Sequence, residues 1–97
     1  MKGYKNYRVT LEHVTDQNID TFDTVFCTTE KEARKAATKM SKSKKFNWLK
    51  NQKNNYGELP NDVRVWIYSD EDSNDDFVQG THTMLFRNGR CEKSTIG

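Results

Sequence analysis

Cysteine and histidine are the side chains that most often bind metals or act as nucleophile and base, and the chain has two of each. They are Cys27, Cys91, His13 and His82. Their number equals that of a tetrahedral zinc site, but none of them forms the close Cys-x-x-Cys or His-x₃-His pair typical of such sites. We therefore interpret the cysteines as small, partly buried residues and the histidines as polar strand positions. We expect no metal and no other cofactor.

Patterns that would indicate catalysis are equally weak. A cysteine or serine nucleophile needs a base and an oxyanion donor, and no local signature supplies them. The glycines are scattered along the chain, so no glycine-rich loop is available to hold a phosphate. We expect a binding protein and not an enzyme.

Carboxylates are concentrated between residues 70 and 76. They are Asp70, Glu71, Asp72, Asp75 and Asp76. The segment lacks the central glycine and the terminal glutamate of a twelve-residue calcium loop. We interpret it as an exposed hairpin tip whose charges imitate phosphates and so bind a basic groove on a partner protein. The alternative is that these charges only keep the tip soluble.

Positive charge is concentrated in the middle of the chain. From Lys31 to Lys53 there are nine lysines and arginines but only one carboxylate, Glu32, with Phe46 and Trp48 between them. Cations that meet phosphates, interleaved with aromatics that stack on bases, are typical of nucleic-acid binding. The net charge of only +2 leaves a solvated helix face as the competing interpretation. The predicted binding residues are Lys35, Lys39, Lys42, Lys44, Lys45 and Trp48.

A third group of binding residues shares one face of a predicted strand. Arg64, Trp66 and Tyr68 alternate with three apolar residues, and these residue types dominate binding hot spots and base-stacking platforms. Burial in the core is the alternative for them. Which face of the sheet stays uncovered decides between the two.

The composition predicts one folded domain over residues 1–97. Apolar residues make up 33% and charged residues 31%, so a single core concentrated in the aromatic side chains is expected. No run approaches the roughly 18 apolar residues that span a bilayer, and the N-terminus has no apolar signal region. We expect a cytoplasmic protein, in which a disulfide between the two distant cysteines is unfavoured.

Periodicity predicts an α+β fold in which an antiparallel sheet of four to five strands carries a helical layer on one face. Thr29 and Glu32 form a capping box, and Ala33, Ala36, Ala37 and Met40 follow at helical spacing as the buried stripe. Asn88-Gly89 is typical of a type I′ hairpin. The predicted elements are strands at 7–12, 21–28, 63–68, 81–87 and 90–93, a helix from 29, a kink or second short helix ending near 51, and a loop at 51–62.

The hairpin, the Thr-x-x-Glu helix start and the return strand at 63–68 resemble small bacteriophage and mobile-element accessory proteins, among them phage inhibitors of bacterial RNA polymerase. The resemblance covers about two-thirds of the chain as architecture. The longer helical region, the acidic segment and the Asn88-Gly89 hairpin depart from that pattern, so no contact residue is carried over.

This resemblance implies a class that blocks host machinery, including RNA polymerase inhibitors, anti-CRISPR proteins and anti-restriction proteins. Our first hypothesis is therefore a phage-type inhibitor or modulator in the host cytoplasm. It docks on a bacterial protein or nucleoprotein complex through the basic helix, the acidic segment or a sheet edge. The alternative is a module that binds DNA or RNA directly through residues 31–53.

Overall fold

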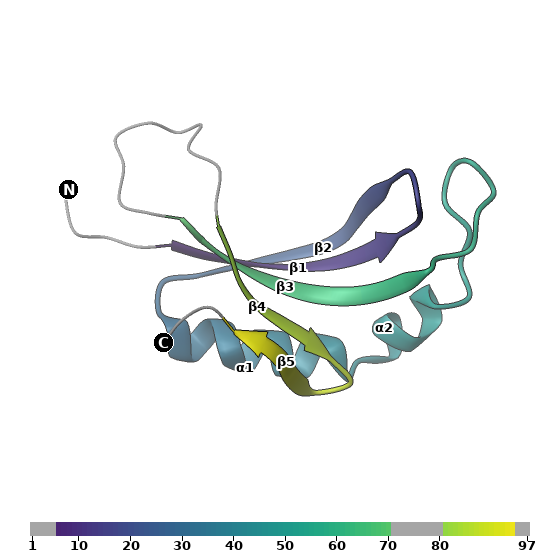
Figure 1. Cartoon of the computed structure of the whole chain (residues 1–97). Helices are drawn as coiled ribbons and strands as arrows, with labels where there is room; N and C mark the ends of the chain where they lie inside the picture. The colour runs from purple at the N-terminus through teal and green to yellow at the C-terminus, as the bar shows by residue number, and fades with distance from the viewer. Residues whose placement is uncertain (1–5, 71–80, 95–97) are drawn as a thin grey trace.

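The computed structural model describes residues 6–70 and 81–94 (Figure 1). Five strands and two helices follow one another along the chain: β1 (Asn6–Val14), β2 (Ile19–Cys27), α1 (Glu30–Ser41), α2 (Lys44–Leu49), β3 (Asp62–Asp70), β4 (Thr81–Arg87) and β5 (Arg90–Ser94). The predicted α+β class is confirmed. No described helix has both the length and the apolar character needed to cross a membrane.

The five strands form one antiparallel sheet with the spatial order β2-β1-β3-β4-β5. This order differs from the order along the chain because β1 lies between β2 and β3. Val9, for example, pairs with Val25 on β2 and with Ile67 on β3. β3 is the central strand, and β2 and β5 are the two edges.

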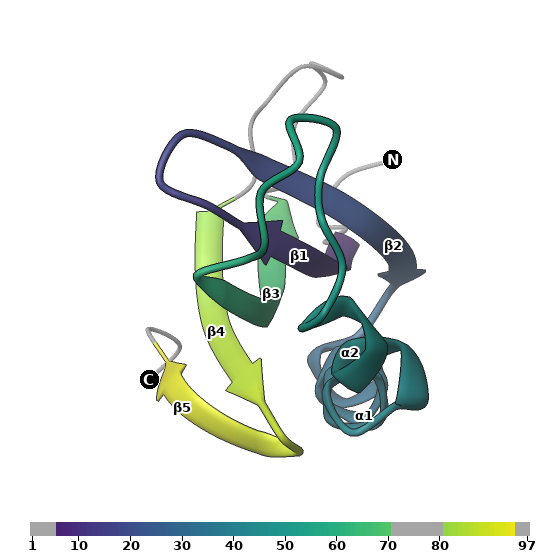
Figure 2. The ribbon, with the colours of Figure 1, turned by 90° about the vertical axis from the view of Figure 1, so that its right-hand side faces the viewer.

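Both helices pack on the same face of the sheet (Figures 1 and 2). Alternate residues of β1 and β3 point toward them and are fully buried, as Val9, Leu11 and Val65 show. The facing side of α1 is built from Ala33 and Ala37, which are also fully buried. Because these side chains are small, the helix approaches the sheet closely, and the predicted buried stripe is confirmed.

Local hydrogen bonds explain where α1 begins. The Thr29 hydroxyl accepts from the Glu32 N–H at 3.2 Å, as an N-cap does. The Glu32 carboxylate accepts from both the Thr28 N–H and the Thr28 hydroxyl, at 3.4 and 3.2 Å. The bonds from Thr28, with a smaller contribution from the Thr29 hydroxyl, lower the pKa of Glu32 below its usual value.

The predicted break after α1 is a second helix with its own cap. The Ser43 hydroxyl accepts from the Phe46 N–H at 3.1 Å and donates to the Met40 C=O at 2.7 Å. This cap restarts the chain as α2 in a new direction, so that Phe46 and Leu49 become fully buried beside the sheet. The short helix thereby extends the core beyond the end of α1.

The turn between β4 and β5 is anchored to the helical layer. Asn88 and Gly89 have φ values of 52° and 82°, which confirms the predicted type I′ turn. The Gly89 N–H donates to the Ser41 hydroxyl at 2.8 Å. A Cβ atom at position 89 would lie 2.6 Å from the Lys42 side chain, so the turn needs glycine both for its dihedral angles and for this close approach.

One expectation for the cysteines and histidines is wrong, namely that Cys91 is partly buried. His13 lies in strand β1 as expected. It is fully buried on the helical side, with its Nε2 atom 2.7 Å from the Gln52 C=O and its ring beside that of Phe22. Cys91 is exposed, whereas Cys27 is half-buried as expected. The two thiols are free and lie on the two opposite edge strands of the sheet.

Candidate functional site

The predicted binding residues do not form one surface. Lys35, Lys39, Lys42, Lys44, Lys45 and Trp48 belong to the helical layer. Arg64, Trp66 and Tyr68 alternate with the buried residues of β3 and therefore lie on the opposite face of the sheet, which no described helix covers (Figure 1). Of the acidic segment, Asp70 is the last residue of β3, while Glu71, Asp72, Asp75 and Asp76 lie outside the described residues.

The outer side of α1 carries a row of lysines. Lys31, Lys35 and Lys39 recur along α1, and Lys42 follows as its C-cap. Helical spacing directs the first three away from the Ala33 and Ala37 side, whereas the stem of Lys42 passes beside the turn at Gly89. All four are exposed. We call these four residues the lysine row.

Most cations of the helical layer are not neutralised within the described chain. Arg34 pairs with Glu30 at 2.9 Å, and Lys45 lies 3.8 Å from the Asp23 carboxylate. Lys50 stands 5.0 Å above the Phe46 ring and 3.4 Å from the Asn88 side-chain oxygen. No ion pair between a described residue and any member of the lysine row is present, so their charge faces solvent.

The charge of the molecule is strongly asymmetric. Of the 16 lysines and arginines, nine lie between residues 31 and 53, a stretch that contains one of the 14 carboxylates. The rest of the sequence therefore has seven cations and thirteen carboxylates. Since all nine cations of the helical stretch are exposed, this layer forms a cationic surface that the net charge of +2 conceals.

The two aromatics of the basic stretch have different positions. Trp48 is 49% exposed and meets the Phe22 ring edge-on, with centroids 6.5 Å apart. Phe46 is fully buried and contributes to the core. Only the first of the two is therefore available for contact with a partner.

The opposite face of the sheet is built around a buried carboxylate that the sequence did not indicate. Glu12 is only 2% exposed. It accepts hydrogen bonds from Arg64 Nε at 2.9 Å, from the Tyr68 hydroxyl at 2.7 Å and from the Thr10 hydroxyl at 3.1 Å. Burial and the neighbouring carboxylate raise the pKa of Tyr68 to about 12.

Arginine side chains cover the aromatic rings of this face. The Arg8 guanidinium lies 4.7 Å from the centre of the Tyr68 ring, and that of Arg64 lies 5.4 Å from the Trp66 ring. Both rings are only partly exposed. Arg64, Trp66 and Tyr68 thus belong to a packed polar network around Glu12, and neither ring forms an open stacking platform.

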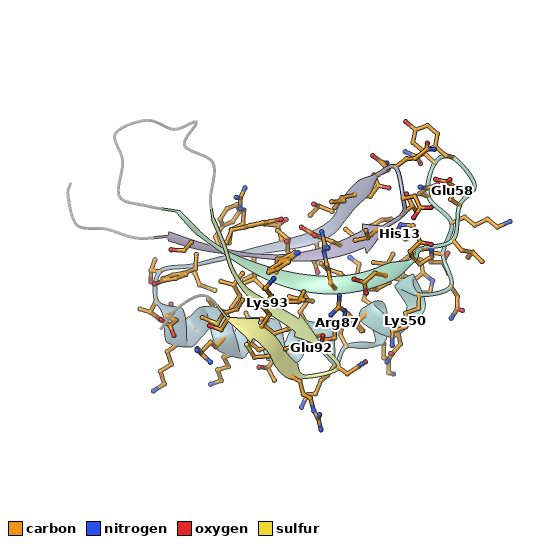
Figure 3. The ribbon with its side chains drawn as sticks, in the orientation of Figure 1. His13, Lys50, Glu58, Arg87, Glu92 and Lys93 are labelled. Carbon is orange, nitrogen blue, oxygen red and sulfur yellow. The ribbon has the colours of Figure 1, made fainter. Side chains whose placement is uncertain are left out.

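A second ionic cluster joins the last three strands. Arg87 on β4 forms two hydrogen bonds with Asp62 at the start of β3, at 3.0 and 2.5 Å, and a further contact with Glu92 on β5. Figure 3 shows Arg87 and Glu92 together on these strands, with Lys50 of the helical layer nearby. Because both oxygens of Asp62 are occupied, the cluster acts as a structural tie between strands.

A cavity beside the lysine row lies between α1 and β2 among the described residues. It has a volume of about 420 Å³, with Val25, Ala36 and Met40 as apolar lining and Asp23, Lys39 and Lys45 as charged lining. This cavity could not be predicted from the sequence because its lining residues come from three separate elements.

No family model, curated protein or solved structure matches this chain.

Proposed function

We propose that the protein is a non-enzymatic binding protein whose helical layer docks on the phosphate backbone of a nucleic acid. The observation that supports this proposal is the lysine row, four exposed cations along α1 and at its C-cap that have no carboxylate partner among the described residues. A nucleic acid carries condensed counterions along its phosphates. These counterions are released when lysines neutralise the phosphates, and their release favours binding.

The geometry favours contacts to the backbone over readout of bases. Lysine is a point charge on a flexible stem, which suits phosphate contact but gives little directional discrimination. The helical layer presents one exposed ring, that of Trp48, and the rings of Trp66 and Tyr68 lie on the other face under arginines. We therefore expect duplex DNA or RNA to be bound with little dependence on sequence.

The proposal predicts a steep dependence of affinity on salt. If the four lysines of the row each neutralise one phosphate, the logarithm of the binding constant should fall with the logarithm of salt concentration with a slope of about −3.6. Affinity for a duplex should then drop about a hundredfold between 50 and 200 mM salt. Fluorescence anisotropy with a labelled 20-base-pair duplex measures this slope.

Single substitutions assign the slope to the lysine row. Lys31→Gln and Lys35→Gln should each reduce the slope by about 0.9. Lys93→Gln, which removes an exposed cation from β5, is the matched control and should leave the slope unchanged. Equal effects of all three variants would indicate that net charge alone is responsible and would contradict the proposal.

The hypothesis of a phage-type inhibitor that docks on a bacterial host protein stays a prediction. In the anisotropy titration, this hypothesis predicts no appreciable complex with naked DNA or RNA. A pull-down from bacterial lysate with and without nuclease separates the two hypotheses, because only a protein partner is retained after nuclease treatment.

A further inference from the structure

The edge strand β2 has an unprotected stretch. In the described chain β2 pairs only with β1, and an edge strand directs alternate N–H and C=O groups to solvent, where another chain can pair with them. The opposite edge, β5, carries Arg90, Glu92 and Lys93, charges of the kind that discourage such pairing. Residues 24–27 of β2 contain no charge and no proline. We call residues 24–27 the β2 edge.

Hydrogen bonds at the start of this stretch show which peptide groups face outward. The Thr24 N–H donates to the exposed Asp23 carboxylate at 3.0 Å. In an antiparallel ladder, each residue directs its N–H and C=O to the same side of the strand, and this side alternates along the strand. The N–H and C=O of Phe26 therefore face outward, as those of Thr24 do. The Phe22 C=O is held by the Lys45 ammonium at 3.1 Å, and Lys45 in turn lies 3.8 Å from the Asp23 carboxylate. Asp23 thus caps the Thr24 N–H within the β2 edge, and Lys45 caps the Phe22 C=O next to it.

The cavity beside α1 adjoins this edge on the helical side. Its apolar lining includes Val25 of the β2 edge itself, which is 38% exposed, together with Met40 of α1. Lys39 and Lys45 line the same cavity. On the other side of the strand, Phe26 is 72% exposed. Backbone groups, an apolar cavity and two cations are therefore available within one short stretch.

We propose that the β2 edge and this cavity bind an extended segment of a partner protein, which adds to the sheet as a further strand. One apolar side chain of the segment enters the cavity, and a carboxylate on the same face pairs with Lys39 and Lys45. Main-chain hydrogen bonds supply the affinity of this mode and the cavity supplies its specificity. The site adjoins the cationic helical surface but does not depend on nucleic-acid binding.

The period of a strand defines the segment that fits. Side chains two residues apart lie on the same face, so a carboxylate two residues from the apolar side chain faces the two lysines. The residue between them lies on the side of Phe26. Acidic segments are favoured because the cavity is lined by two cations and one carboxylate, that of Asp23.

Asp23 competes with the incoming segment. The segment must take the Thr24 N–H from the Asp23 carboxylate, and its own carboxylate then replaces Asp23 beside Lys45. Removal of the Asp23 carboxylate should therefore strengthen binding. A purely structural role for Asp23 would instead leave peptide affinity unchanged.

The probe is a fluorescein-labelled nine-residue peptide of threonines with a central leucine and glutamates two positions to either side. Its binding to the full chain is measured by fluorescence anisotropy, next to a matched peptide with lysines in place of the glutamates. The acidic peptide should bind at least about tenfold more tightly than the basic one. Equal affinity of the two peptides, or no binding of the acidic one, would overturn the proposal.

Substitutions in the β2 edge test the backbone contacts. Phe26→Pro removes an outward N–H without removing a hydrogen bond to β1, and it should weaken peptide binding about tenfold relative to Phe26→Ala, which keeps that N–H. Asp23→Ala should strengthen binding severalfold. If thermal unfolding shows that Phe26→Pro does not fold, the Asp23→Ala comparison decides, and an unchanged affinity overturns the proposal.

Two further outcomes separate this site from its alternatives. Lys31→Gln and Lys35→Gln should leave peptide affinity unchanged even where they reduce nucleic-acid binding, so the two proposals can fail independently. Sedimentation of the wild-type chain tests for self-association. A concentration-dependent dimer that Phe26→Pro abolishes would show that the β2 edge pairs with a second copy of the chain, and it would overturn the proposal of a peptide partner.

Discussion

At the scale of single residues, Glu12 is a buried carboxylate that three side chains hold in place. A buried carboxylate is costly unless hydrogen bonds satisfy it, and here Arg64, Tyr68 and Thr10 supply them. Glu12 could not be recognised from the sequence because it shares with Arg8 and Thr10 a strand face whose polar residues indicate exposure to solvent. Its partner Arg64 is 52 residues away, and only the pairing of β1 with β3 brings the two together.

The raised pKa of Tyr68 predicts a loss of stability at alkaline pH. An unfolded tyrosine ionises near pH 10, whereas Tyr68 in the fold keeps its proton to about 12. Between these values the folded state binds more protons than the unfolded state, so the free energy of unfolding falls as pH rises. Tyr68→Phe removes this contribution, and the stability difference between wild type and variant should shrink from pH 9 to pH 11.5.

Urea unfolding at the two pH values measures that difference. At pH 9 the variant should be less stable by about 1.5–3 kcal/mol, because it loses a hydrogen bond to a charged group. Tyr56→Phe is the matched control, since Tyr56 is an exposed tyrosine in the loop after α2. A stability difference between wild type and Tyr68→Phe that does not change with pH would show that ionisation of Tyr68 is not linked to folding.

At the scale of elements, the sequence predicted what short-range interactions determine. The Thr29 cap and the Asn88-Gly89 turn each depend on residues within about four positions, and both form where the sequence predicted them. The second short helix was predicted only as an alternative to a kink, and its Ser43 cap was not predicted. The order of strands across the sheet depends on long-range pairing instead. For the same reason the cavity between α1 and β2 and the separation of Trp48 from Trp66 were not foreseen.

The buried side of α1 provides the stability test at this scale. Ala37 is fully buried against the sheet, so Ala37→Asp places a carboxylate among apolar side chains out of contact with solvent. We expect the free energy of unfolding to fall by about 3 kcal/mol or more, with a clear drop in thermal midpoint. Lys35→Asp, on the exposed side of the same helix, is the control and should change the midpoint little. Equal midpoints for wild type and Ala37→Asp would contradict the packing of α1 on the sheet.

At the scale of the whole molecule, the helical layer and the sheet have different roles. The lysine row and the cavity beside β2 lie on one side, whereas the network around Glu12 lies on the other. The basic stretch was visible in the sequence as a charge pattern, but its exposure depended on how α1 and α2 were packed. The acidic residues Glu71, Asp72, Asp75 and Asp76 lie outside the described residues, so their predicted role in partner binding stays a prediction.

The uneven distribution of charge also makes this protein a permanent dipole in solution. A chain with nine cations in one stretch and an excess of carboxylates elsewhere does not behave as a uniform sphere of charge +2. We expect it to adsorb to a negatively charged chromatography resin through the exposed cations of its helical layer. We expect neighbouring molecules near the isoelectric point to attract one another through regions of unlike charge, so that solubility at low ionic strength depends on orientation as well as on net charge.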